Sequence, residues 1–298
     1  MVFEIRTAGP EDAVGIARVW AATMPQLVKT KRAIETELRH SRSRGVLIAA
    51  DGADVVGYAN IYLPAADAEA PQLRITLQVP SEDRKRGIGS ALLAAITERA
   101  VQVGGGGLLV VVRDEDESKD FAAKRGFELK RRMTNSTADL TAAREPVAPP
   151  DGLRVVDYDQ LTPRQLFDAE VAVRDDDPSG LSGGPAYDEW VEVSWRNPDG
   201  RRDLSFAVLD GDQVLSFVTT TADPERNLMW SNLTGTIPSA RGRGLAKVVK
   251  SVALARARDA GFVTASTGND AANAPMLAVN RWLGYQETSA AWTAEKAL

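Results

Sequence analysis

One short phrase occurs twice in this chain, and it constrains the fold more than any other feature. Residues 79–93 read VPSEDRKRGIGSALL, and residues 237–247 read IPSARGRGLAK. Both contain Pro-Ser and then, after two intervening residues in the first copy and one in the second, Arg-x-x-Gly-x-Gly/Ala. A short apolar run precedes each copy and a long amphipathic run follows it, so we expect a strand that turns directly into a helix. The same turn found twice predicts a tandem repeat.

The order of elements around the two phrases supports a repeat. In each copy the pattern predicts a strand, two helices, a hairpin that turns at Asp-Gly, a strand, the phrase, a long helix, a buried strand, a short helix that ends at Gly-aromatic, and a last strand. The spacing agrees, since Gly87 to Gly126 is 39 residues and Gly244 to Gly284 is 40. The expected segments are 3–7, 10–24, 31–40, 45–65, 72–79, 87–103, 108–112, 117–127 and 134–140, and then 153–158, 162–175, 187–195, 204–222, 228–237, 244–260, 262–268, 273–285 and 289–297.

A proline-rich stretch separates the two copies. Residues 141–152 read TAAREPVAPPDG and show little periodicity, which is typical of a linker. We therefore predict an N-terminal domain at 1–141, a linker at 142–152 and a C-terminal domain at 153–298. The alternation of strands and helices predicts an α/β class with a mixed sheet in each domain.

Composition excludes several classes of protein. The chain of 298 residues has no cysteine and one histidine, His40, so thiolate chemistry is excluded and no metal site is expected. The net charge of −5 with interspersed signs disfavours a nucleic-acid partner. The N-terminus lacks the apolar segment of a secretory signal, and no run reaches the ~20 apolar residues of a membrane helix. We expect a cytoplasmic protein without a membrane partner.

The repeated turn has the chemistry of an anion site. The first amides of a helix have no partner within the helix, and the helix dipole adds positive potential there. Glycines allow close approach of a phosphate to the backbone, and arginine adds a fixed cation. A Walker A loop is excluded because no Gly-Lys-Ser/Thr follows, and the Gly-x-Gly-x-x-Gly pattern is absent as well.

These residues resemble a known family. Arg84-Lys85-Arg86-Gly87-Ile88-Gly89 and Arg241-Gly242-Arg243-Gly244-Leu245-Ala246 are similar to the acyl-CoA pyrophosphate loop of the GNAT N-acetyltransferase superfamily, and KRGF at 124–127 and RWLGY at 281–285 resemble its later Gly-aromatic signature. The resemblance extends over nearly the whole chain, as two tandem GNAT domains. It implies a sheet that splays between the strand before the loop and the strand after the long helix, with the pantetheine arm in that V.

The resemblance also implies which residues bind acetyl-CoA, the expected cofactor. The backbone near Val79, or near Thr236 and Ile237, would face the thioester. The pyrophosphate would bind the amides of one of the two turns, and Asn273 would hold the pantetheine or serve only as a helix cap. The implied loop residues are Arg84, Lys85, Arg86, Gly87, Ile88, Gly89 and Ser90 in the first copy, and Arg241, Gly242, Arg243, Gly244, Leu245, Ala246 and Lys247 in the second.

The catalytic residues depart from the family pattern in both copies. The tyrosine that protonates the leaving thiolate in the family lies four residues before the glycine of Gly-aromatic, where this chain has Ala122 and Asn280. Asn280 can form hydrogen bonds but cannot supply a proton at neutral pH. Asp176, in an acidic loop after the first helix of the second copy, is a candidate for amine attraction or proton removal. Because the first copy has four acidic residues at 114–117 where the second has asparagines, we expect the second domain to be the active one.

The function implied is acetyl transfer from acetyl-CoA to a primary amine of a small molecule, by direct attack in a ternary complex. Two alternatives remain open at this point. One is an acyl-CoA-binding module without catalysis, favoured by the missing tyrosines, and the other is acetylation of a protein or peptide amine. The chain is expected either as a monomer with pseudo-twofold tandem domains or as a homodimer.

Overall fold

The structure is a computed structural model that describes residues 3–40, 44–62, 70–174 and 186–298. The chain divides into two compact units. Unit 1 comprises Met1–Arg131 and Ala291–Leu298, and unit 2 comprises Arg132–Ala290. Within the described ranges, no helix is long and apolar enough to cross a membrane, and no group of His, Cys, Asp and Glu side chains could hold a metal ion.

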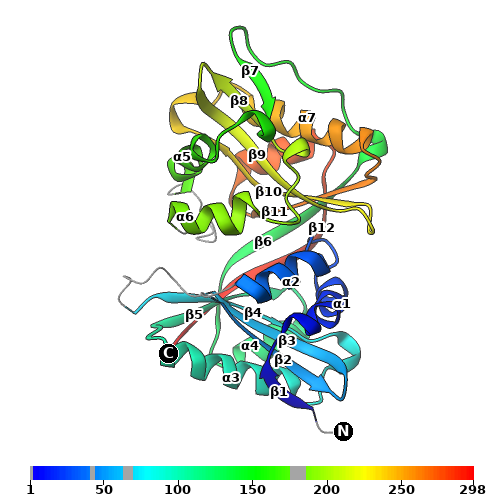
Figure 1. Cartoon of the computed structure of the whole chain (residues 1–298), viewed down its shortest axis with the longest axis vertical. Helices are drawn as coiled ribbons and strands as arrows, with labels where there is room; N and C mark the ends of the chain where they lie inside the picture. Colours follow the sequence, from blue (N-terminus) through cyan, green and yellow to red (C-terminus); the bar gives the residue numbers. More distant parts are fainter. Residues whose placement is uncertain (1–2, 41–43, 63–69, 175–185) are drawn as a thin grey trace. The chain divides into compact units, whose positions relative to one another are not determined.

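Unit 1 is a mixed sheet with helices on both faces. Its strand order is β1-β2-β3-β4-β5-β12, with β5 parallel to β4 and antiparallel to β12. The helices α1 and α2 pack on one face, and α3 and α4 pack on the other (Figure 1). Its elements are β1 (Glu4–Thr7), α1 (Ala13–Thr23), α2 (Lys31–His40), β2 (Arg44–Asp51), β3 (Asp54–Tyr62), β4 (Gln72–Gln78), α3 (Ile88–Gln102), β5 (Gly107–Arg113) and α4 (Asp116–Ala123).

Unit 2 repeats this arrangement. Its strand order is β6-β11-β10-β9-β8-β7, and β11 is parallel to β10. A π-helix, Val191–Trp195, continues α6. The elements are β7 (Arg154–Asp157), α5 (Pro163–Arg174), α6 (Tyr187–Trp190), β8 (Phe206–Asp210), β9 (Gln213–Asp223), β10 (Leu228–Thr236), α7 (Leu245–Asp259), β11 (Thr264–Asp270) and α8 (Ala274–Trp282).

The helices form where local sequence signals predict them. Thr162 and Gln165 form reciprocal hydrogen bonds at the start of α5, with the Thr162 amide donating to Gln165 Oε1 at 2.9 Å and the Gln165 amide donating to Thr162 Oγ1 at 3.3 Å. Gly87 and Gly244 precede α3 and α7 with φ of 87° and 76°. The chain turns from strand to helix through a left-handed backbone conformation at these two positions. Glycine adopts this conformation at little steric cost because it has no Cβ.

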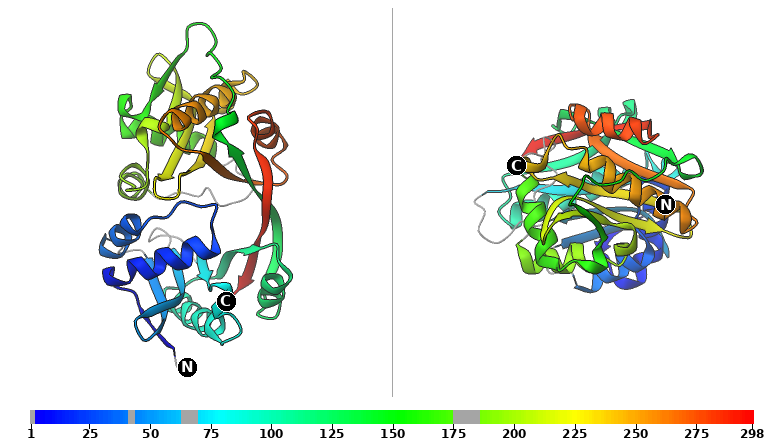
Figure 2. Two further views of the ribbon diagram at one scale, coloured as in Figure 1. Left: turned by 90° about the vertical axis from the view of Figure 1, so that its right-hand side faces the viewer. Right: turned by 90° about the horizontal axis from the view of Figure 1, so that it is seen from above.

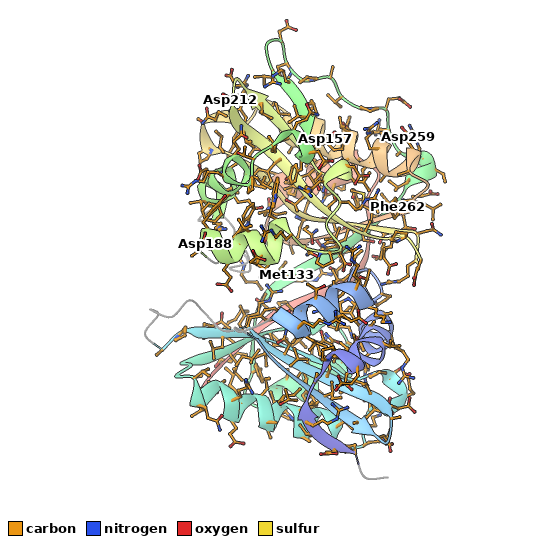
Figure 3. All side chains as sticks on the ribbon, viewed as in Figure 1. Met133, Asp157, Asp188, Asp212, Asp259 and Phe262 are labelled. Atoms are coloured by element: carbon orange, nitrogen blue, oxygen red, sulfur yellow. The ribbon has the colours of Figure 1, made fainter. Side chains whose placement is uncertain are left out.

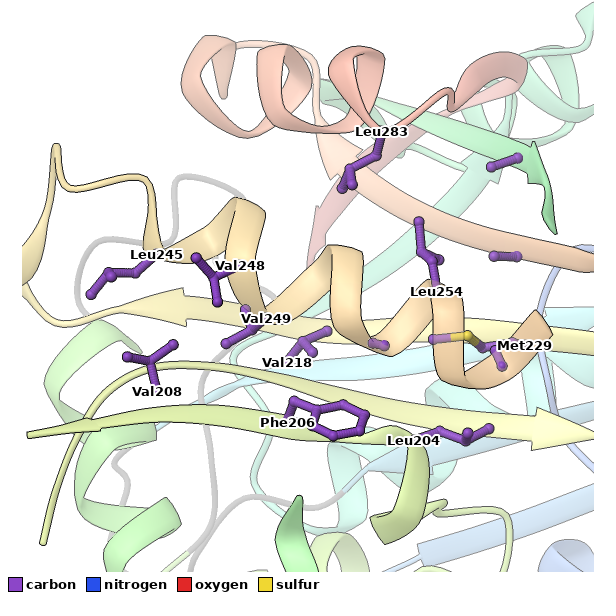
Figure 4. Packing of buried hydrophobic residues seen from close by; sticks show 14 of the residues in the cluster. Leu204, Phe206, Val208, Val218, Met229, Leu245, Val248, Val249, Leu254 and Leu283 are labelled. Atoms are coloured by element: carbon purple, nitrogen blue, oxygen red, sulfur yellow. The ribbon is translucent and has the colours of Figure 1, made fainter. Parts of the chain in front are cut away.

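The main core of unit 2 lies between α7 and the sheet. Val248 and Val249 of α7 point toward the strands that carry Val218 and Met229, and Leu254 and Leu283 point toward one another (Figure 4). In Figure 3, Asp259 at the end of α7 and Phe262 before β11 mark the tight connection between these two elements. Phe262 is buried in the same core.

The last strand of each sequence repeat crosses from one unit to the other. β6 (Glu128–Asp139) leaves unit 1 after Arg131 and pairs antiparallel with β11 in unit 2. β12 (Gln286–Ala297) leaves unit 2 after Ala290 and pairs antiparallel with β5 in unit 1. The two strands run side by side (Figure 2). Each sheet is therefore completed by the strand that ends the other sequence repeat.

The stretch between the repeats is attached to unit 2. After a short 3₁₀ turn at Leu140–Ala142, residues 143–153 form no helix or strand. Ala143, Val147 and Leu153 pack on the core under α7, and the Val147 amide donates to Ser251 Oγ at 2.9 Å. The division into 1–141, 142–152 and 153–298 stays a prediction. Residues 63–65, expected at the end of the first hairpin, lie outside the described residues.

Candidate active site

The parallel strands β10 and β11 of unit 2 separate next to the repeated turn, and we call the opening between them the groove of unit 2. β10 pairs with β11 over Leu228–Ser231, whereas its pairing with β9 continues to Thr236. A register shift in β10 lies between Ser231 and Thr234, at the point where the two parallel strands separate. Unit 1 has the same opening, since β4 pairs with β5 only over Gln72–Arg74. The splayed sheet expected from the sequence is thus present in both units.

The turn of unit 2 presents a row of free amides. In the described part of the chain, the backbone N–H groups of residues 242–246 donate no hydrogen bond. Gly242 and Gly244 both have φ of 76°, and no atom lies within 4 Å of the position that a Cβ would take at either residue. A phosphate can therefore approach this backbone closely, at the N-terminus of the 15-residue helix α7.

The basic side chains of this turn have different roles. Arg241 Nε donates to the carbonyl of Thr236 at 3.2 Å, as Arg84 Nε does to the carbonyl of Val79 at 3.4 Å in unit 1. This arginine therefore fixes the turn to the end of the strand in both units. Arg243 is exposed and forms no ion pair with a described residue, so its guanidinium is available to an anion.

The corresponding turn of unit 1 is neutralised by its own carboxylates. Glu117, in the first turn of α4, lies 3.0 Å from Arg84 and 3.5 Å from Lys85, and these cations hold the pKa of its carboxyl below the ordinary value. Glu115 lies 3.7 Å from Arg84. These ion pairs span the groove from the turn to α4. The more basic loop of the first copy is therefore the less available to a phosphate.

Further contacts reduce the space in the groove of unit 1. A Cβ on Gly89 would lie 3.2 Å from the ring of Phe121, which projects from α4. Arg125 stacks on the same ring and its Nη2 donates to Ser90 Oγ at 2.5 Å.

Arg86 pairs with Asp51 and Asp83 and lines a cavity of about 320 Å³ that is also lined by Asp54 and Glu82. An anionic ligand would meet more carboxylates than cations there.

Asparagines occupy the corresponding end of the groove in unit 2. Asn273 Oδ1 accepts a hydrogen bond from the Met276 amide at 3.2 Å, so Asn273 caps α8. Asn280 is 2% exposed, and its Nδ2 donates to Asn269 Oδ1 at 2.6 Å. Asn280 Oδ1 is buried and has no hydrogen-bond partner in the described chain. An unpaired buried acceptor is costly, and a ligand amide or hydroxyl could satisfy it.

Sequence reasoning missed one acidic residue of this unit. Glu170 on α5 is 8% exposed, and Trp190 Nε1 donates to its Oε2 at 2.7 Å. Burial raises the pKa of Glu170 to about 6, against the opposing effects of Trp190 and Arg174. Its position in the sequence carried a signal, because Glu170 falls at the apolar spacing of its helix, four residues after Leu166 and three before Val173.

Glu170 lies on the helix that covers the strand next to the groove. Val173, three residues further along α5, is close to β10, since a Cβ on Gly235 would lie 2.9 Å from Val173 Cγ2. A carboxylate with a raised pKa near the expected thioester strand has the properties of a general base. Asp176, the candidate from the sequence, lies outside the described residues.

Three of the expected cofactor residues have buried side chains, which leaves only their backbone for contact with a cofactor. The side chains of Ile88, Leu245 and Ile237 are 1%, 1% and 6% exposed and belong to the cores. The Ile237 amide donates to the carbonyl of Leu215 at 3.0 Å, and Thr236 Oγ1 lies 2.9 Å from Ser216 Oγ. Lys247 lies with its Nζ 4.9 Å from the ring centroid of Trp282. Their roles toward a cofactor stay predictions.

Comparison with known proteins agrees with the fold and the turns. Residues 14–127 match the acetyltransferase (GNAT) family. These residues therefore form a GNAT acetyltransferase domain, and the splayed sheet and glycine turn of unit 2 repeat the features of unit 1. The family uses acetyl-CoA as its acyl donor.

Relatives match this chain over both units. The mycothiol acetyltransferase of Thermomonospora curvata is 28% identical over 297 residues, which cover 96% of this chain and 93% of that protein. That of Rhodococcus erythropolis is 28% identical over 250 residues, 79% of each chain. A tandem GNAT protein from the clavulanic acid biosynthesis pathway has the same fold, with a TM-score of 0.77 at 19% identity over 99% of this chain and 98% of that one.

Proposed function

We propose that this protein transfers an acetyl group from acetyl-CoA to a primary amine of a small molecule, and that the reaction takes place in unit 2. One observation carries the choice of unit. Arg243 of unit 2 forms no ion pair with a described residue, whereas in unit 1 Glu117 forms ion pairs with Arg84 and Lys85. The pyrophosphate of acetyl-CoA carries negative charge, so the turn of unit 2 is the better site.

The residues of unit 2 have distinct roles in this proposal. The amides of residues 242–246 and the Arg243 guanidinium bind the pyrophosphate. The groove between β10 and β11 receives the pantetheine arm, and Asn280 Oδ1 accepts a hydrogen bond from one of its amides. Acetyl-CoA supplies an activated thioester to this groove. Glu170 removes the proton from the acceptor amine, since a carboxylate with a pKa of about 6 is a stronger base than an ordinary glutamate.

A small-molecule acceptor is supported by the relatives. Their common name, mycothiol acetyltransferase, denotes acetylation of a small molecule. The unacetylated amine precursor of mycothiol is therefore the first acceptor to test. A cytoplasmic location and the absence of a nucleic-acid partner stay predictions.

The test is calorimetric titration of acetyl-CoA into the wild-type protein, Gly87→Glu and Gly244→Glu. Each variant places a carboxylate in one turn, and the two are matched because both glycines have positive φ. We expect one site in the wild type, its loss in Gly244→Glu and its retention in Gly87→Glu. Loss in Gly87→Glu alone would contradict the choice of unit. Turnover is then measured as thiol release with a panel of small amines, and a panel of peptides serves as the contrast.

A further inference from the structure

At four equivalent positions, unit 1 has an apolar residue and unit 2 has a polar one. Six residues after the glycine that starts the long helix, unit 1 has Leu93 and unit 2 has Lys250. Directly after the glycine of Gly-aromatic, Phe127 and Tyr285 each donate their amide to the residue five positions earlier. Two residues beyond the buried strand pairs Leu73–Leu108 and Met229–Ala265, unit 1 has Ile75 and Val110 where unit 2 has Ser231 and Thr267.

The four residues of unit 2 form a buried polar cluster. Lys250, Tyr285, Ser231 and Thr267 are each 3% exposed or less. Lys250 Nζ lies 5.3 Å from the ring centroid of Tyr285, and the Tyr285 hydroxyl lies 3.4 Å from Ser231 Oγ. Thr267 Oγ1 donates to the carbonyl of Ser231 at 3.2 Å. The four counterparts in unit 1 belong to an apolar core.

No carboxylate of a described residue compensates the charge of Lys250. In the described chain no carboxylate forms an ion pair with Lys250, and its contact is the face of Tyr285, the titratable group that lies against it. Burial alone lowers the pKa of Lys250 to about 7. Burying an amine without a partner is costly. Unit 1 shows that the fold accepts leucine at this position, so stability does not explain the lysine.

The cluster lies at the closed end of the groove. Ser231 and Thr267 are the last residues at which β10 and β11 pair, and the strands separate beyond them. Its polar atoms therefore lie where the two strands begin to open. Acyl transfer releases an anion in this groove, the sulfur of the leaving thiolate. The family's tyrosine position holds Asn280, which cannot donate a proton to it.

We propose that Lys250 stabilises and protonates the thiolate that acyl transfer releases in unit 2. This inference rests on the proposed function. As the acceptor nitrogen bonds to the acyl carbon, the carbon–sulfur bond breaks and its electron pair stays on sulfur. The Lys250 ammonium donates a proton to that sulfur and becomes a neutral amine. The proton lost by the acceptor nitrogen passes to Glu170 and from there to solvent, and solvent reprotonates Lys250, so protons and electrons balance.

The test measures the ionisation of the thiol of bound CoA by its ultraviolet thiolate absorbance across pH. The proteins are wild type, Lys250→Leu, Tyr285→Phe and Arg256→Leu. The first two variants carry the residues that unit 1 has at these positions, and Arg256→Leu removes an exposed charge from the same helix. We expect the apparent pKa of the bound thiol to be about one to three units lower in wild type than in Lys250→Leu, because the thiolate and the ammonium form of Lys250 stabilise each other as a pair. Arg256→Leu should match the wild type.

The urea midpoint of each variant separates a functional role from a structural one. Lys250→Leu should unfold at higher urea than wild type while it loses turnover, whereas a structural lysine would make that variant less stable. Tyr285→Phe keeps Lys250 and should retain most of the thiol pKa shift. Equal thiol pKa values in wild type and Lys250→Leu, with CoA still bound, would overturn the role of Lys250 and leave the proposed function intact. Failure of wild type to bind CoA would overturn both.

Discussion

Glu117 lies 3.0 Å from Arg84 in unit 1, so a carboxylate of the protein occupies the cationic turn at which a phosphate would bind. Glu117 stands at the start of α4 and Arg84 in the turn before α3, so their contact crosses the groove. In unit 2 the equivalent of Glu117 is Pro275, counted from the glycine of each Gly-aromatic pair, and no such ion pair is possible there.

Reversing the charge of Glu117 should create an anion site in unit 1. Glu117→Lys releases Arg84 and Lys85 and adds a third cation, so we expect adenosine 3′,5′-bisphosphate to bind unit 1 about tenfold more tightly, the effect of about 1.4 kcal/mol. The measurement is calorimetry in a Gly244→Glu background, which removes the site in unit 2. Asp116→Lys is the matched control, because Asp116 is fully exposed and pairs only with Lys119 among described residues. Equal binding by both variants would mean that overall charge alone is responsible.

A charge at Ala294 should destabilise unit 1 although the residue belongs to the last strand of the second repeat. Ala294 is fully buried in the core of unit 1 and pairs with Val110. Ala294→Asp buries an unpaired carboxylate, at a cost of several kcal/mol. We expect hydrogen exchange to show lost protection in β4 and β5 with β10 and β11 unchanged. Glu295→Ala, on the same strand but half-exposed, serves as the control, and lost protection confined to unit 2 would refute the exchange of strands.

Because Lys250 is buried, the free energy of unfolding of the protein should rise with pH in the alkaline range. Its pKa is about 7 in the folded protein and 10.5 ordinarily, so folding favours the neutral amine. The unfolded chain then binds more protons between these values, and the free energy of unfolding rises with pH across that window. Relative to Lys250→Leu, wild type should gain up to about 1.4 kcal/mol per pH unit. Urea unfolding of both proteins from pH about 7 to about 10 measures this difference. If the free energies of unfolding of wild type and Lys250→Leu change with pH in parallel, the pKa of Lys250 is not lowered in the folded protein.

Glu170 should affect both stability and turnover. Its pKa is about 6 in the folded protein against an ordinary 4.5, so the protonated acid is favoured and stability falls as pH rises through that interval. In Glu170→Gln the amide oxygen can still accept from Trp190, and this fall should disappear. If Glu170 is the base, kcat/KM falls about 100-fold and the acidic limb of the pH profile is lost. Glu192→Gln, an exposed residue on the neighbouring helix, is the control, and an unchanged kcat/KM would exclude Glu170 as base.

Much of the fold follows from local signals. The glycines at 87 and 244, the apolar strands before them and the amphipathic helices after them predict the two GNAT-like turns, because backbone conformation at a glycine and periodicity along a helix depend on neighbouring residues. The same signals predict the hairpins at Asp-Gly and the capped start of α5. The expected grooves between β4 and β5 and between β10 and β11 follow from the family resemblance and are present.

The tertiary structure decided what the sequence left open. Which carboxylates neutralise Arg84, which strand completes each sheet, and which polar residues are buried all depend on contacts between segments distant in the chain. Arg84 and Glu117 are 33 residues apart, and Val110 and Ala294 are far more distant, so no local pattern links them. The sequence by itself determined two copies of one turn. Only the tertiary structure shows that the turn of unit 1 is paired with carboxylates of the same unit and that Lys250 is buried in unit 2. Both depend on which distant residues surround a side chain in the folded protein.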